Sequence, residues 1–106
     1  MAGHVSFGLS IQGEGPAILG CSFRVNGKII DQPARWVEAP VLLLWQVESE
    51  RKEIFSERVG EVIFALYSDH TRQERLSDTG WFEWQLLGAG FMDMAKQQSV
   101  MKLYGK

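Results

Sequence analysis

The chain has 106 residues, close to the commonest size of one domain, so we expect a single domain over residues 1–106. An apolar share of 45% and a charged share of 23% are typical of globular proteins and argue against a disordered or fibrous chain. The formal net charge of −2 provides no long-range attraction for phosphate backbones, which argues against nucleic acid as a partner.

The first predicted element is a strand near the N-terminus. Apolar residues occupy every second position from Val5 to Ile11, which is the period of a strand with one buried face. Two glycines and a proline in residues 13–16 favour turn geometry and predict a break after this strand. We expect the next strand to run from Ala17 to Val25.

The dipeptide Asn26-Gly27 predicts a hairpin directly after Val25. A two-residue type I′ turn needs positive φ at both central positions, which Asn and Gly tolerate best. Such a turn places Val25 opposite Lys28 across the ladder. This hairpin is the clearest local signal in the chain.

A connection and an apolar strand are predicted next. Residues 31–40 contain Pro33 and Pro40 and are typical of an irregular connection. Residues 41–47 are apolar on both faces, which predicts a central strand that is covered on both sides.

Two shorter strands are expected beyond this run. Residues 52–55 predict a short strand after a turn, and residues 62–67 form a second run rich in β-formers. A helix over residues 57–67 is the competing prediction.

Strand and helix signals overlap in the C-terminal third. Alternation at Phe82 and Trp84 favours a strand that ends at Leu87. A helical face fits the same region, but Gly88 and Gly90 would each cost about 1 kcal/mol inside a helix. We therefore expect a terminal helix from about Phe91 to Tyr104, while the choice between strand and helix for residues 81–90 stays open.

These elements predict an α+β fold that is mainly antiparallel β. The sheet would be curved or form a partly closed barrel, with the C-terminal helix packed against it. No internal repeat is present, and residues 31–40 are too short to separate two domains.

The sequence also argues against membranes and secretion. No run of about eighteen apolar residues is present, and the first four residues lack the order of a signal peptide. Cys21 is the only cysteine, so no intramolecular disulfide forms, as is usual where thiols stay reduced. We expect a cytoplasmic protein with no membrane partner.

Motifs for catalysis and cofactors are missing from the sequence. Neither Gly13–Ile18 nor Gly88–Asp93 contains the third glycine of the dinucleotide fingerprint. Cys21, His4 and His70 are too few for a structural zinc site. We predict no metal and no cofactor, nominate no catalytic residue, and regard an enzyme as the less favoured class.

The tryptophans are the strongest binding candidates. Four are present, and Trp is enriched in binding hot spots and ligand pockets. Trp36 follows Arg35 in the proline-containing connection, where large aromatic residues are less often needed for a core. Trp81 is the second candidate, because the register that buries Phe82 and Trp84 turns it outward. We take Trp36, Trp81 and Arg35 as the predicted binding residues.

The strand, turn and strand of residues 20–30, Gly-Cys-Ser-Phe-Arg-Val-Asn-Gly-Lys-Ile-Ile, resemble a hairpin found early in some small immunity proteins of bacterial toxin systems. The resemblance covers about a tenth of the chain and assigns no functional residue. It implies a small bacterial protein that engages a protein partner.

The function that we favour from the sequence is a non-catalytic interaction module, an accessory or immunity-like protein. The alternatives are a small-molecule-binding protein or minor enzyme with a Trp-lined pocket in the mouth of the sheet, and a single-strand binder that its charge disfavours. A lightly charged strand beside an outward Trp81 also predicts a homodimer, with Trp81 and part of the terminal helix near its interface.

Overall fold

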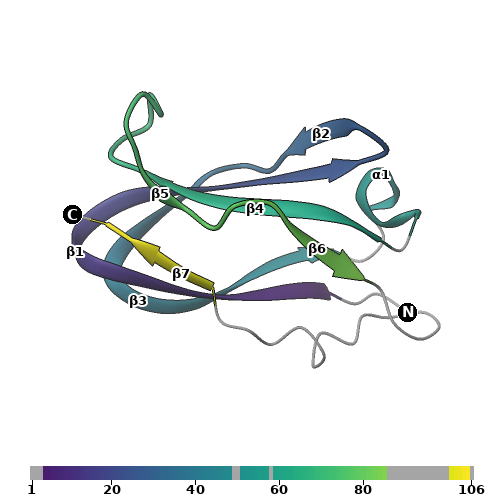
Figure 1. The fold of residues 1–106 in the computed structure, drawn as a ribbon. Coiled ribbons are helices and arrows are strands. Elements are labelled where there is room, and N and C mark those ends of the chain that lie inside the picture. Colours follow the sequence, from purple (N-terminus) through teal and green to yellow (C-terminus); the bar gives the residue numbers. More distant parts are fainter. Residues whose placement is uncertain (1–3, 49–50, 58, 86–100, 106) are drawn as a thin grey trace.

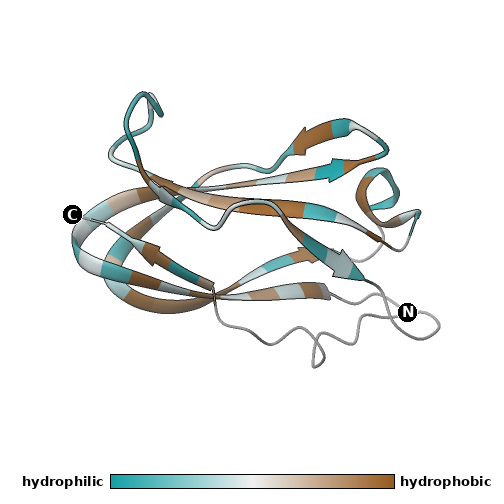
Figure 2. Cartoon of the chain, in the orientation of Figure 1, coloured by the Kyte–Doolittle hydropathy of each residue, from teal (hydrophilic) through white to brown (hydrophobic). Residues whose placement is uncertain are grey.

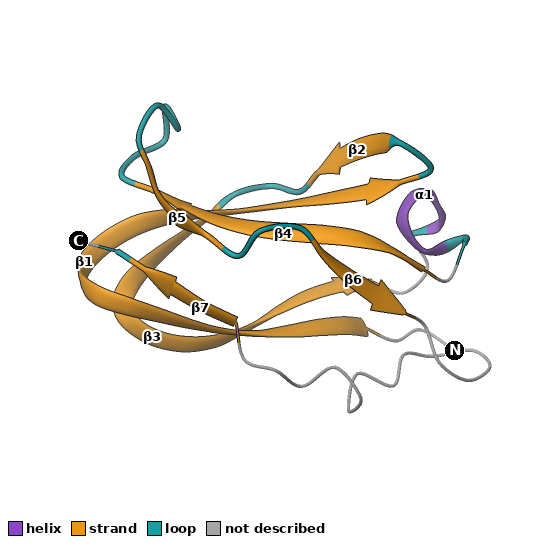
Figure 3. Cartoon of the chain, viewed as in Figure 1, coloured by secondary structure: helices purple, strands orange, loops and turns teal. Residues whose placement is uncertain are grey.

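Seven strands and one short helix make up the described part of the chain, residues 4–48, 51–57, 59–85 and 101–105 of a computed structural model (Figures 1 and 3). In chain order these elements are β1 (His4–Val25), β2 (Lys28–Asp31), β3 (Arg35–Glu48), α1 (Lys52–Phe55), β4 (Val59–Tyr67), β5 (Arg75–Asp78), β6 (Phe82–Gln85) and β7 (Met101–Tyr104).

The 22-residue strand β1 organises the sheet. It pairs in antiparallel fashion with β2, β3 and β4, and in parallel with β7. β4 in turn pairs with β5 and β6. The predicted fold is therefore confirmed as a mainly antiparallel, curved sheet, and the described strands do not close into a barrel.

β1 bends in its middle instead of ending there. The ladder with β3 shifts register between Ile11 and Gly15, and Gly13 and Gly15 have φ values of 106° and 98°. These angles favour glycine and let the strand turn while pairing continues beyond it. The predicted break at residues 13–16 is thus a bulge within one strand, and Figure 1 shows β1 and β3 curving together at this point.

The core lies between the two halves of the bent sheet. Alternate side chains of both halves of β1 point inward, and Phe7 and Phe23, from opposite sides of the bend, have ring centroids 6.0 Å apart. Phe64 of β4 lies 5.5 Å from Phe7, and Trp84 of β6 is fully buried. Burial of such aromatic side chains is the main stabilising contribution to a domain of this size.

The predicted hairpin at Asn26-Gly27 is confirmed. Asn26 and Gly27 have φ values of 52° and 75°, and Val25 lies opposite Lys28 as expected.

Two predictions for the middle of the chain are wrong. β3 begins at Arg35, so only residues 32–34 remain of the predicted connection. Pro40 is tolerated there because β3 is an edge strand among the described elements, where a missing N–H removes no ladder bond. Within the described sheet, residues 41–47 therefore lie at an edge and not at the centre, and one of their two faces is exposed to solvent.

Of the next two predicted strands, the first is wrong and the second is confirmed. Residues 52–55 form α1 rather than a strand, because one helical turn buries the adjacent side chains of Ile54 and Phe55 together. β4 confirms the strand at residues 62–67 and contradicts the competing helix, since Val62, Phe64 and Leu66 are buried at every second position.

The C-terminal helix is wrong where the structure describes it. Residues 101–104 form β7, which pairs with residues 9–12 of β1 and places Leu103 in the core. The remaining part of that prediction, residues 91–100, lies outside the described residues. β6 confirms a strand at residues 82–85, and residues 86–90 are not described.

We predict that Gly27→Val lowers the free energy of unfolding by more than about 1 kcal/mol, because a β-branched side chain resists the positive φ of the turn. A Cβ at Gly27 meets no atom within 4 Å, so the effect isolates backbone strain from packing. Urea denaturation provides the measurement, with Lys28→Val in the adjoining strand as the control. Equal midpoints for Gly27→Val and the wild type would contradict the turn assignment.

Candidate functional site

The side of β3 that faces away from β1 is an open edge of the described sheet. β3 pairs with β1 from end to end, and within the described residues no strand lies along its other side. An edge strand of this kind offers a row of main-chain N–H and C=O groups to a further strand.

The direction of these groups follows from the pairing on the far side of β1. The Gly105 N–H donates to the carbonyl oxygen of Gln12 at 2.8 Å. The main-chain N–H and C=O groups of even-numbered residues in this half of β1 therefore point towards β7. The main-chain groups of odd-numbered residues such as Leu9 consequently point towards β3, where Leu9 lies opposite Leu43. On β3, residues 42, 44 and 46 therefore direct their N–H and C=O groups to the open edge.

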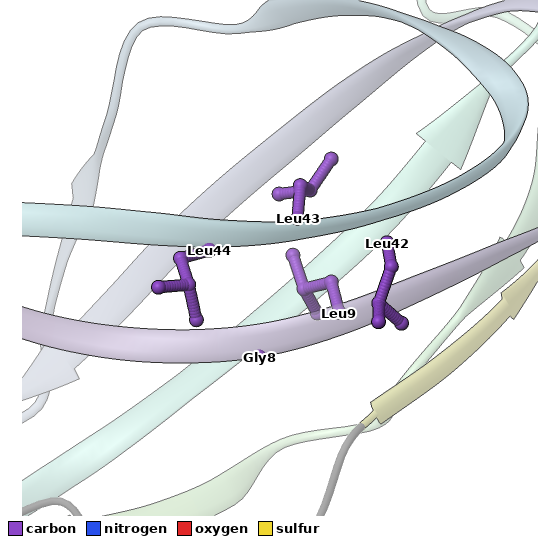
Figure 4. Close-up of a pocket in the computed structure, with 5 residues that line it drawn as sticks. All are labelled: Gly8, Leu9, Leu42, Leu43 and Leu44. Carbon is purple, nitrogen blue, oxygen red and sulfur yellow. The ribbon is translucent and has the colours of Figure 1, made fainter.

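Two leucines of the same stretch project into solvent. Leu42 is 72% exposed and Leu44 is 58% exposed, although apolar side chains of this size are usually buried. Gly8 of β1 lies opposite Leu44 and has no side chain, and a hollow of about 240 Å³ is found here. These three residues line it together with Leu9 and Leu43, and the lining is mainly apolar (Figure 4).

This part of β3 also lacks charge. Residues 41–47 include no Asp, Glu, Lys or Arg, and Figure 2 shows hydrophobic colouring along the strand beyond its bend. Exposed strand edges are normally protected from association by charged residues or by short length. An uncharged apolar edge is consequently a surface that another chain would cover.

Arg35 is a cation that lies against this edge. Because β3 bends, the guanidinium of its first residue lies 4.6 Å from the ring centroid of Trp45, on the second half of the same strand. Arg35 Nη1 also donates to the carbonyl oxygen of Leu44 at 3.5 Å. Among the described residues, no carboxylate forms an ion pair with Arg35. The structure thus brings Arg35, predicted as a binding residue, next to Leu44.

Trp36 lies on the outer face of the other half of β3. Its side chain is 59% exposed, in agreement with the predicted exposure, and Ile18 lies opposite it on β1. A hollow of about 150 Å³ adjoins it, lined also by Pro16, Ala17, Ile18, Ser68, Asp69 and His70. The structure separates Trp36 from the leucine hollow, since the two sets of lining residues have no member in common.

The polar side of this second hollow carries a negative charge. The Thr71 hydroxyl and the Thr71 N–H both donate to Oδ1 of Asp69. These hydrogen bonds lower the pKa of the Asp69 carboxyl, so the group is ionised at neutral pH. The Trp36 hollow therefore combines an aromatic side chain with a fixed carboxylate.

Trp81, the third predicted binding residue, has a different environment. It is half-buried, and the guanidinium of Arg24 lies 4.3 Å from its ring centroid. Arg24 is itself held by Glu61 through a 2.9 Å ion pair. Trp81 is thus covered on one side by a residue of its own chain, and its place in a homodimer interface stays a prediction.

The described residues include neither a cluster of metal-ligating side chains nor a helix long enough to cross a membrane. No group of three His, Cys, Asp or Glu side chains among them is placed to hold a metal ion. The sole helix that the structure describes, α1, has four residues, far fewer than a membrane-crossing helix requires.

Sequence reasoning missed Leu42, Leu44 and Gly8. The uncharged apolar run is visible in the sequence, but apolar residues on both faces are typical of a central strand, so burial is the natural prediction. A usable signal is Pro40, directly before the run, since proline within a strand indicates a sheet edge.

Comparison with known proteins provides no assignment. No protein-family model, curated protein or solved structure matches the chain.

We predict that the Cys21 thiol stays unreactive in the folded protein at about pH 8, because burial raises its pKa and keeps it neutral. A thiol-specific colorimetric reagent would then react only after urea is added.

The raised pKa of Cys21 also makes the free energy of unfolding depend on pH. The unfolded chain ionises near its ordinary pKa of 9.0 while the folded chain stays protonated, so stability that is present below this pH is lost above it. Urea denaturation at about pH 7 and about pH 10 should show a larger loss for the wild type than for Cys21→Ala. Equal losses in the two proteins would contradict the prediction.

Proposed function

We propose that this protein is a non-catalytic interaction module that binds an extended segment of a protein partner along the open edge of β3. The observation that carries the proposal is the exposure of Leu42 and Leu44, 72% and 58%, on a strand whose outer main-chain groups have no strand partner in the described part of the chain. An added strand would pair with those groups and cover both leucines, which is a common mode of peptide recognition.

The apolar contact and the main-chain pairing are both needed for binding. Covering the exposed parts of the two leucines contributes roughly 2–4 kcal/mol in total. Each main-chain hydrogen bond adds about 0.5–1.5 kcal/mol. Association itself costs at least about 4 kcal/mol, so the leucines alone would give little net affinity. The partner must therefore be an extended segment and not an isolated apolar side chain.

The resemblance of residues 20–30 to immunity proteins adds a cellular role to this proposal. We infer an accessory, immunity-like function in a bacterial cytoplasm, where binding a protein partner is the whole activity. The exposed groups on β3 support such a role, because leucine side chains and main-chain amides recognise a partner without supplying a nucleophile or a general acid.

We predict that short peptides selected from a random display library bind along β3. Leu42→Asp combined with Leu44→Asp should weaken the selected peptides at least about tenfold in calorimetric titration, because it places two charges in an apolar contact. The matched control is Ile29→Asp on β2, whose side chain is 56% exposed and lies away from this edge.

The control should bind the peptides as tightly as the wild type. A failure to select any peptide, or an equal loss of affinity in the control, would refute binding at β3.

A second candidate function, binding of a small molecule, is favoured by the hollow beside Trp36. It lies on the outer face and not in the predicted mouth of the sheet, and its volume of about 150 Å³ suits a single ring. Trp36 supplies a face for stacking, while Asp69 and His70 supply polar contacts at its border. A ring compound with an apolar face and hydrogen-bonding edges is the ligand class that this lining fits.

We predict that ring-containing fragments shift the backbone amide signals of residues 68–70 in ¹⁵N-resolved NMR spectra. Trp36→Ala should abolish these shifts because the stacking face is lost, whereas Trp36→Phe should retain part of them. Spectra without shifts at these residues, or the same shifts in Trp36→Ala, would rule out the Trp36 hollow as a ligand site.

A further inference from the structure

Arg35 lies at the β3 edge and carries a positive charge that no carboxylate of the described residues neutralises through an ion pair. Its guanidinium has five N–H donors, and the contact with the Leu44 carbonyl oxygen, at the long distance of 3.5 Å, uses one of them. The guanidinium lies over the Trp45 ring, which limits its movement, while the Arg35 side chain stays exposed to solvent. A planar guanidinium held in this way is arranged to receive a carboxylate through two parallel hydrogen bonds.

The acidic residues near Arg35 do not fill this position. Asp31 accepts a hydrogen bond from the Ser22 hydroxyl, and Glu38 lies on the outer face of β3, opposite to the inner face shared by Arg35 and Trp45. No ion pair joins either carboxylate to Arg35. The Arg35 guanidinium is therefore available to pair with a carboxylate from outside the described residues.

The open edge fixes where a partner's side chains would lie. A residue of an added strand opposite Leu44 would take over the Leu44 carbonyl oxygen and release Arg35 from it. The neighbouring partner residue, opposite Trp45, would then point to the inner face, beside the guanidinium. Partner residues opposite Leu42 and Leu44 would instead point to the outer face and contact the leucines.

Resting on the function proposed above, we propose that the segment bound by β3 carries an Asp or Glu opposite Trp45 that pairs with Arg35. Read from its N-terminus, an antiparallel partner strand then has an acidic residue opposite Trp45, an apolar residue opposite Leu44, any residue next, and an apolar residue opposite Leu42. A parallel partner strand has the same residues in the reverse order. Arg35 thereby selects acidic partners, while Leu42 and Leu44 provide sequence-tolerant apolar contact.

A second copy of the chain fits this edge less well. Residues 41–47 of the copy supply no acidic side chain. Two-fold pairing of the β3 edges would also bring both Arg35 guanidiniums towards the same axis, where like charges repel. An acidic segment of a different protein is consequently the occupant that charge complementarity favours.

The test compares matched peptides and charge-reversed proteins. Peptides selected on the wild-type protein should be enriched in the order given above, and replacing their Glu with Gln should weaken binding at least about tenfold. Arg35→Glu should weaken the Glu peptide and strengthen a Lys version of it, while Arg35→Lys should keep a reduced preference for Glu over Gln, because an ammonium retains the charge but not the two parallel hydrogen bonds. Arg35→Gln replaces Arg35→Glu if the latter does not fold, and should remove the difference between the Glu and Gln peptides.

The outcomes separate this inference from the proposed function. Peptides that depend on Leu42 and Leu44 but bind equally with Glu or Gln would overturn the role of Arg35 and leave binding at β3 intact. Failure to select any peptide would remove the proposed function and the inference together. Sedimentation equilibrium that shows a dimer lost in Leu44→Asp would overturn the inference in favour of a second copy.

Discussion

The ladder between β1 and β3, bent in its middle, is the constraint on which the rest of the structure depends. Both strands continue through the bend, so each contributes to both halves of the folded sheet. Phe7 and Phe23 belong to one strand yet pack against each other across the core. The two glycines that bend β1 thus allow a single pair of strands to supply two facing layers, which are completed by β4 and the shorter strands.

The same bend generates the candidate site. It returns the start of β3 to its own second half, which places the Arg35 guanidinium over Trp45. Among the described strands β3 lies at an edge, since β1 pairs with one side of it and no other strand pairs with it. Charge, apolar surface and free main-chain groups therefore meet on one strand without any contribution from a distant loop. An edge that is already in the extended conformation reduces the entropy cost of the association proposed above.

Local signals predicted the parts of the fold that local physics determines. Alternation from Val5 to Ile11 and the Asn26-Gly27 turn depend on neighbouring residues only, and both predictions were correct. The edge position of residues 41–47 depends on which strands pair with β3, and the strand at residues 101–104 depends on β1, far away in the sequence. Exposure of Trp36 was predicted from its flanking residues, whereas the leucine hollow requires Gly8 from another strand.

The parallel pairing of β7 with β1 has a consequence for the order of events during synthesis. Leu9 lies opposite Met101, and 101 − 9 gives a separation of 92 positions, so this pairing forms only after the segment around residue 101 has left the ribosome. Until then the side of β1 that receives β7 lacks its strand, and the place of Leu103 in the core is not filled. Contacts between distant positions slow folding because a long loop must close first. The nascent chain therefore passes through a period in which residues 9–12 of β1 lack the strand that pairs with them in the folded protein, and an unpaired strand edge favours association until β7 arrives.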